Sequence, residues 1–177
     1  MTTGLVIVHT GEGKGKTTAA LGMAIRAWGE GLRILILQFI KGSWKYGELK
    51  ALKQLSEIDG RLQVRQCGLG FSQREGKDSP EHREAALVAW QEAMAAVTSG
   101  DWDMIVLDEI NYAVKFGLLE EENIQALLSA RPKELHLVLT GRDALPSLIE
   151  NADLVTEMKL VRHPFQKGIK AQPGIEF

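Results

Sequence analysis

The sequence predicts an α/β fold, namely a doubly wound, mostly parallel sheet of about six strands with helices on both faces, giving three layers. Three observations support this prediction. Six short runs rich in Val, Ile and Leu recur along the chain, and segments with helical spacing separate them. The apolar residues in these runs occupy consecutive positions, which suits strands buried on both faces of a helix-covered parallel sheet.

The expected elements follow from these runs in chain order. The strands are expected at residues 4–10 (GLVIVHT), 32–40 (LRILILQFI), 61–67 (RLQVRQC), 103–109 (DMIVLDE), 135–141 (LHLVLTG) and 152–161 (ADLVTEMKLV). The helices are expected at Thr17–Glu30, Gly47–Leu55, Pro80–Ser99 and Leu119–Ala130. Within Pro80–Ser99, the residues Leu87, Trp90, Met94 and Val97 recur at helical steps, which predicts one apolar face packed on the sheet.

Length and composition restrict the class of protein. A chain of 177 residues with 45% hydrophobic content is expected to form a single domain, residues 1–177. The formal charge of −2 and the lack of a Lys/Arg block give no indication of a nucleic-acid or membrane-surface partner. Cys67 is the only cysteine, which excludes an internal disulfide and fits a reducing compartment. No apolar run approaches a membrane span and no signal-peptide pattern is present, so we expect a cytoplasmic protein.

The stretch HTGEGKGKTT joins the first expected strand to the first expected helix. Glycines at 11, 13 and 15 allow the backbone to turn so that several N–H groups point inward, and the helix N-terminus adds partial positive charge. Lys16 supplies an ammonium group, and Thr17 offers a hydroxyl to a magnesium ion. The strict pattern GxxxxGK(S/T) requires glycine where this chain has Thr10, so the match is close but incomplete. The interpretation is a phosphate-binding loop; the alternative is an ordinary glycine-rich turn.

Two carboxylates, Asp108 and Glu109, end the apolar run DMIVLDE. In a doubly wound sheet they emerge at the same edge as the loop, where they can hold magnesium directly or through water. The sequence therefore predicts binding of ATP or GTP with Mg²⁺. At this point a kinase, an ATP-driven motor, a switch and a transferase all remain open.

Further motifs are expected at the same sheet edge. The stretch FIKGSWKYGE carries Lys41, Trp44, Tyr46 and Glu48. The glycine-rich stretch GLGFSQ carries Phe71. Ordinary packing of Trp44 and Phe71 and stacking on a flat partner both remain open. The last residues, VRHPFQKGIKAQPGIEF, lack the periodicity of a core element.

Together, the motifs TGEGKGKTTAALG, FIKGSWKYGE, GLGF, VLDEI, LTGR, ADLVTEM and HPFQKGIKAQPGIEF resemble the ATP:corrinoid adenosyltransferase family of the cobalamin-pathway type. The resemblance covers about Leu5 to Phe177. It implies a P-loop NTPase-like (RecA-like) fold. It also implies transfer of the 5′-deoxyadenosyl group of ATP to the Co(I) of a reduced corrinoid, such as cob(I)yrinic acid a,c-diamide or cobalamin, with triphosphate leaving.

The resemblance also implies the roles of individual residues. ATP lies reversed along the loop, so that the ribose C5′ is presented for attack, and Lys14 beside Lys16 suits a leaving group that carries the whole triphosphate charge. The residues expected to bind the nucleotide or corrinoid are Gly11, Glu12, Gly13, Lys14, Gly15, Lys16, Thr17, Thr18 and Trp44. The family commonly has a neutral amide where this chain has Glu12, whose side chain is therefore expected to face away from the phosphates. Thr17 and Glu109 correspond to the pair that holds Mg²⁺ (or Mn²⁺), and adjacency makes Asp108 an outer partner.

Lys16, Thr17, Glu109 and Phe71 are the expected catalytic residues. By resemblance, Phe71 helps to displace the lower ligand of a Co(II) corrinoid so that a flavoprotein can reduce it. Some members have tryptophan where this chain has Gln73, and Trp44 or Tyr46 would then take over part of that role. A homodimer is expected from the family. Several members have about two dozen residues before the first strand, whereas Met1–Gly4 precede it here, so any covering role of that extension is expected to be absent or filled otherwise.

Two other functions remain as alternatives. A P-loop ATPase of the recombinase or motor type would release ADP and phosphate, and a corrinoid carrier would leave ATP unchanged. The balanced charge and the lack of a basic loop argue against the motor.

Overall fold

The computed structural model describes residues 3–42, 46–70 and 80–176. It confirms the predicted α/β fold, with one six-stranded sheet in the order β3-β2-β4-β5-β1-β6. Every strand pair in it is parallel. The strands are β1 (Val6–Thr10), β2 (Ile34–Gln38), β3 (Leu62–Gln66), β4 (Met104–Asp108), β5 (His136–Thr140) and β6 (Leu154–Glu157).

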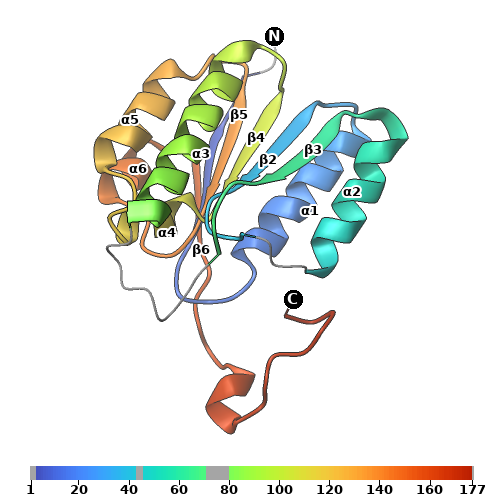
Figure 1. Ribbon diagram of the computed structural model, residues 1–177, viewed down its shortest axis with the longest axis vertical. Coiled ribbons are helices and arrows are strands. Elements are labelled where there is room, and N and C mark those ends of the chain that lie inside the picture. Colours follow the sequence, from blue (N-terminus) through green and yellow to red (C-terminus); the bar gives the residue numbers. More distant parts are fainter. Residues whose placement is uncertain (1–2, 43–45, 71–79, 177) are drawn as a thin grey trace.

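Helices cover both faces of the sheet (Figure 1). They are α1 (Lys16–Gly29), α2 (Gly47–Asp59), α3 (Pro80–Ser99), α4 (Ile110–Lys115), α5 (Glu121–Ala130) and α6 (Pro146–Asn151), followed by a 3₁₀ helix, η1 (Pro164–Lys167). The four predicted helices are present. The second is longer than predicted, and the last strand is shorter than the predicted run. The short helices α4 and α6 were not predicted, because six residues are too few to show helical periodicity.

The core lies in two layers, one on each side of the sheet. Val8 and Leu35 point to the side covered by α3 and α5, whereas Ile7 and Ile34 point to the side covered by α1. This alternation is the period of two expected of β-strands, and both sides are apolar because both are covered.

The predicted face of α3 is confirmed in part, since Val97 is buried and Trp90 and Met94 pack partly buried against the core. Ala86, Ala89 and Ala93 are almost fully buried, whereas Leu87 is exposed. Small side chains let the helix approach the sheet closely, so its contact stripe contains alanines in addition to the larger apolar residues that mark helical periodicity most visibly. Within the described residues, no helix is both long and apolar enough to cross a bilayer.

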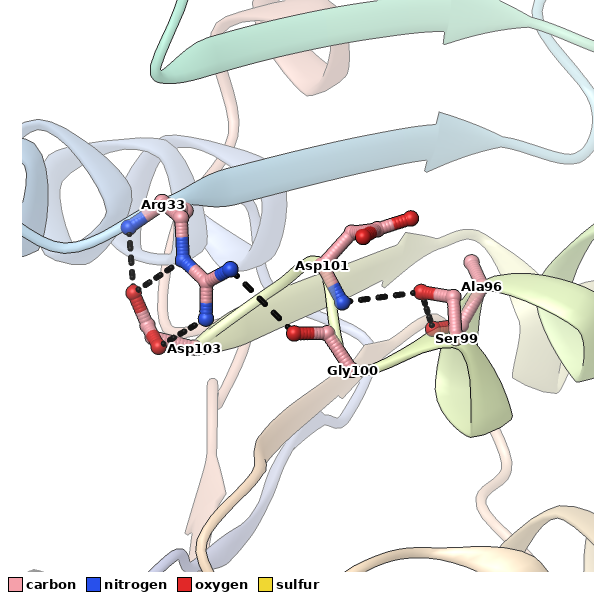
Figure 2. Close-up of polar contacts among 6 residues, drawn as sticks. All are labelled: Arg33, Ala96, Ser99, Gly100, Asp101 and Asp103. Atoms are coloured by element: carbon pink, nitrogen blue, oxygen red, sulfur yellow. Dashed lines mark hydrogen bonds and ion pairs between the residues drawn. The ribbon is translucent and has the colours of Figure 1, made fainter.

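An ion pair between Arg33 and Asp103 links two strands at the amino-terminal edge of the sheet (Figure 2). Arg33, just before β2, donates from its backbone N–H and its Nε to Asp103 Oδ2 at 2.8 and 3.0 Å, and from a terminal nitrogen to Oδ1 at 2.8 Å. Its other terminal nitrogen donates to the Gly100 carbonyl at 3.2 Å. In the same turn, the Asp101 N–H donates to Ser99 Oγ at 3.0 Å. These bonds fix the end of α3 and the start of β4 against β2.

Candidate active site

A cavity of about 460 Å³ lies at the carboxyl-terminal edge of the sheet. Its walls include residues 13–18, from the glycine-rich loop after β1 and the start of α1, together with Lys41, Glu109, Arg142 and Glu176. These residues come from the segments that follow β1, β2, β4 and β5 and from the C-terminal end of the chain. In open parallel sheets, ligands bind in the crevice at this edge. The structure thus brings together the glycine-rich loop, the loop after β2 and Glu109, as the sequence predicts, whereas Phe71 lies outside the described residues.

The loop after β1 turns on glycines. Gly11 and Gly15 have φ values of 96° and 106°, which favour glycine. A Cβ atom at Gly11 or Gly13 would lie 2.6 Å from the backbone oxygen of Met158. The Gly13 N–H donates to that same oxygen at 2.6 Å. The glycines therefore let the loop pack directly against the chain that leaves β6, in addition to allowing its turn.

Lys16 follows the glycine-rich loop, and its side chain folds back beneath that loop. Its side chain is buried, with the residue 7% exposed, and Nζ donates to the carbonyl oxygens of Gly11 and Gly13 at 2.8 and 2.6 Å. Burial lowers the pKa of this ammonium group, and the nearby carboxylate of Glu109 opposes that shift. Lys16 thus places a poorly hydrated positive charge on the floor of the cavity. Because water screens this charge little, its electrostatic attraction for a bound anion is strong.

Asp108 is the centre of a buried polar network. Its side chain has no solvent exposure. Its Oδ1 accepts hydrogen bonds from the Thr17 and Thr140 hydroxyls, each at 2.8 Å. Its Oδ2 accepts from Gln38 Nε2 at 3.1 Å and pairs with Lys41 Nζ at 3.2 Å. A fully buried carboxylate acts here through the groups that it orients, and the outer role of Asp108 at a metal site stays a prediction.

Glu109 has an unusual backbone conformation for a residue with a side chain. Its φ is 63°, in the left-handed region, and its N–H donates to Thr140 Oγ1 at 2.9 Å. This turn directs the chain from β4 into α4 and leaves Glu109 on the cavity wall. Burial and then the neighbouring Asp108 raise the pKa of its carboxyl group, while Lys41 opposes the shift. A carboxylate held this way is stabilised by a bound cation.

Two cations at the mouth pair with carboxylates of the chain. Arg142 lies 2.9 Å from Glu12, and Lys14 lies 3.7 Å from Glu176. The Glu12 side chain is therefore held by Arg142, which itself lines the cavity, and the expectation that Glu12 faces away from the phosphates stays a prediction.

The loop after β2 is linked to the Asp108 network. The Tyr46 hydroxyl donates to Gln38 Oε1, and Lys41 Nζ lies 4.7 Å from the centre of the Tyr46 ring. Trp44 and Phe71, named above as candidate residues, lie outside the described residues, as does Gln73.

Sequence reasoning missed Gln38, Thr140 and Glu176. Gln38 and Thr140 are the last residues of β2 and β5, the two strands that flank β4. A polar residue at the end of an otherwise apolar strand is the signal that could have found both. Nothing local marked Glu176, since its contact depends on the path of the C-terminal segment.

Comparisons with known proteins agree with this geometry. The family model described as ATP:corrinoid adenosyltransferase BtuR/CobO/CobP matches residues 2–177. A corrinoid adenosyltransferase of Pseudomonas aeruginosa is 42% identical over 98% of this chain and 84% of its own length. One from Escherichia coli K12 is 39% identical, and the corrinoid adenosyltransferase CobA of Salmonella typhimurium is 38% identical. Both of these matches cover 98% of this chain and 86% of the relative. The chain therefore belongs to the ATP:corrinoid adenosyltransferase family and is a transferase.

Proposed function

We propose that this protein transfers the 5′-deoxyadenosyl group of ATP to the Co(I) of a reduced corrinoid and releases triphosphate. The observation that carries the proposal is the charge of the cavity. Four cationic side chains of the described residues line it, namely Lys14, Lys16, Lys41 and Arg142. Cations placed around a leaving group stabilise the charge that it gains in the transition state. A cluster of this size suits a leaving group that retains all three phosphates.

The bond changes balance without a protein base. The electron pair of Co(I) forms the cobalt–carbon bond at C5′ while the bond from C5′ to the α-phosphate oxygen breaks, and that electron pair leaves with triphosphate. No proton is transferred in this step. The residues of the chain would therefore hold ATP so that C5′ faces the corrinoid, and stabilise the departing charge.

Thr17 and Glu109 fit the proposed Mg²⁺ or Mn²⁺ site. The Thr17 hydroxyl donates its proton to Asp108, so its oxygen lone pairs are left to face a cation. Glu109 provides a carboxylate on the same cavity wall. Among the described residues, no three His, Cys, Asp or Glu side chains gather as a metal site, so phosphate oxygens and water would complete the coordination. Such an ion would supply further positive charge to the triphosphate.

The proposal includes a corrinoid bound over this edge against Trp44 and Phe71, reduction by a flavoprotein, a homodimeric assembly and a cytoplasmic location. All of these parts depend on the family resemblance. The two aromatic residues lie outside the described part of the chain.

The test is an anaerobic reaction of the purified protein with ATP, Mg²⁺ and chemically reduced cob(I)alamin. We expect the visible spectrum to become that of a light-sensitive alkylcobalt product, with one triphosphate released per turnover. An unchanged cobalt spectrum with ADP and phosphate appearing would contradict the proposal and favour an ATPase. ATP recovered intact in the presence of bound corrinoid would favour a carrier.

A further inference from the structure

The C-terminal segment, residues 158–176, returns to the phosphate loop. It begins where the Met158 N–H donates to the Thr10 carbonyl at 2.8 Å. Figure 1 shows it leaving the sheet below β6, turning through η1 and rising again toward the body of the domain. At its end, Ile175 and Glu176 contribute to the wall of the cavity. The last described residue of the chain is thus part of the candidate active site.

The carboxylate of Glu176 is held close to Lys14. Its side chain is 12% exposed, and one carboxylate oxygen lies 3.7 Å from Lys14 Nζ. The Glu176 N–H donates to the Gln172 carbonyl at 3.0 Å, so a turn fixes the backbone from which this side chain projects. A carboxylate of this chain therefore lies beside a cation that the proposed function gives to triphosphate.

The other pair at the mouth is arranged differently. Both side chains of the Glu12–Arg142 pair are about half exposed, whereas Glu176 is largely buried against the cavity. Water screens an exposed pair more strongly than a buried one. Of the two carboxylates, Glu176 is thus the one that is itself better shielded from solvent, while its partner Lys14 is 55% exposed.

We propose that Glu176 is a further functional residue of this site, whose carboxylate pairs with Lys14 until a phosphate group of the ligand displaces it. The proposal rests on the proposed function, because it assumes that triphosphate binds over the loop. Since Glu176 is tethered to the same chain, it competes at a high effective concentration. It therefore weakens the binding of the triphosphate product and assists its release at the end of each turnover.

The test is calorimetric titration of the full chain with inorganic triphosphate and Mg²⁺ at low salt. Removing a competing carboxylate in Glu176→Gln is expected to lower the dissociation constant about two- to fivefold, the range of a partly exposed ion pair. The matched control is Glu92→Gln, which removes the same charge from an ion pair with Arg65, away from the residues that line the cavity. It is expected to bind triphosphate like the parent. In a Lys14→Gln background, Glu176→Gln should have no further effect.

The outcomes separate this inference from the proposed function. If the parent binds triphosphate and Glu176→Gln binds it equally or more weakly, only the inference is overturned. The same holds if Glu176→Gln tightens binding just as much in the Lys14→Gln background, because the effect then does not pass through Lys14. If neither the parent nor Glu176→Gln binds triphosphate, the inference is overturned, whereas the proposed function is tested separately by the reaction with cob(I)alamin. Tighter binding that depends on Lys14 and diminishes at high salt supports the inference.

Discussion

The two edges of this sheet use charged residues in opposite ways. At the amino-terminal edge, Arg33 and Asp103 satisfy each other with three hydrogen bonds, and both side chains remain partly exposed to water. At the carboxyl-terminal edge, Lys16 and Asp108 are buried, and they hold the loop backbone and the Thr17 hydroxyl in place. The pair at the amino-terminal edge lies partly in solvent, whereas the buried groups at the carboxyl-terminal edge hold residues that line a cavity.

The two edges also differ in backbone conformation, because strained φ values occur near the cavity. Near the cavity, Glu109 and Asp143 have φ values of 63° and 52°, the two positive values found for described residues other than glycine. Such conformations cost free energy and persist only where the surrounding structure imposes them. They follow β4 and β5 at the carboxyl edge, where parallel strands present their ligand-binding loops. The comparison shows that an ion pair stabilises the amino-terminal edge of the sheet, whereas the carboxyl-terminal edge carries the candidate binding site.

Lys16→Ala is the largest expected test of this comparison. It removes a buried ammonium group from the floor of the cavity, so we expect kcat/KM for adenosylation to fall by roughly 100-fold or more, the size typical of losing a charge-assisted contact to a developing anion. The measurement is the initial rate with cob(I)alamin at varied ATP. Lys53→Ala, on the exposed face of α2, is the control and should keep the parental rate. Near-normal turnover of Lys16→Ala would overturn the assignment of the loop.

The loop glycines provide the next largest effect. A Cβ at Gly13 would lie 2.6 Å from the Met158 carbonyl oxygen, so Gly13→Ala must move the loop or the chain after β6. We expect loss of measurable ATP binding and a free energy of unfolding lower by about 1–3 kcal/mol. The matched variant is Gly22→Ala on α1, where a Cβ meets nothing within 4 Å. It should raise stability by up to about 1 kcal/mol, because alanine favours a helix interior. Equal behaviour of the two variants in ATP titration and urea unfolding would contradict the packing described.

At both edges, the sequence predicted what local patterns mark and missed the long-range contacts. The strands and the glycine-rich loop between β1 and α1 were predictable, because apolar runs and the GKGKTT motif are local signals. The network around Asp108 was not, since Gln38 and Thr140 meet it only through the strand order β2-β4-β5. The Arg33–Asp103 pair likewise joins residues far apart in sequence through adjacent parallel strands. Strand order depends on long-range packing, to which no single run of residues points.

Asp103→Asn should weaken the amino-terminal edge without changing catalysis. The hydrogen bonds from the Arg33 guanidinium hold the pKa of the Asp103 carboxyl group below its ordinary value of 3.8. Because the folded pKa is the lower one, the pair stabilises the fold above about pH 3.8, and this stabilisation is lost as the pH falls through the folded pKa. We expect the variant to lose about 0.5–1 kcal/mol at pH 7, a modest value since the pair is half exposed.

The measurement is urea unfolding over a pH series, together with the adenosylation rate at pH 7. The stability difference from the parent should be constant near neutrality and should close in acid. Asp101→Asn is the control, because Figure 2 shows the Asp101 side chain pointing away from Arg33. A slower adenosylation rate in Asp103→Asn at full folding would mean that the two edges are coupled, contrary to the comparison.

Tyr46→Phe gives the smallest expected effect and tests how far the carboxyl-edge network extends. Burial raises the pKa of Tyr46, so its hydroxyl stays protonated and donates to Gln38 at any physiological pH. Gln38 in turn donates to Asp108, which accepts from the proposed metal ligand Thr17. Removing the hydroxyl leaves a buried amide oxygen without this donor, at a cost of about 1 kcal/mol. We expect the Mg²⁺ concentration for half-maximal rate to rise a few-fold with little change in the maximal rate.

In a Gln38→Leu background, Tyr46→Phe should have no further effect, since the chain of hydrogen bonds is already broken. An unchanged Mg²⁺ requirement would confine the network to Asp108 and its direct partners.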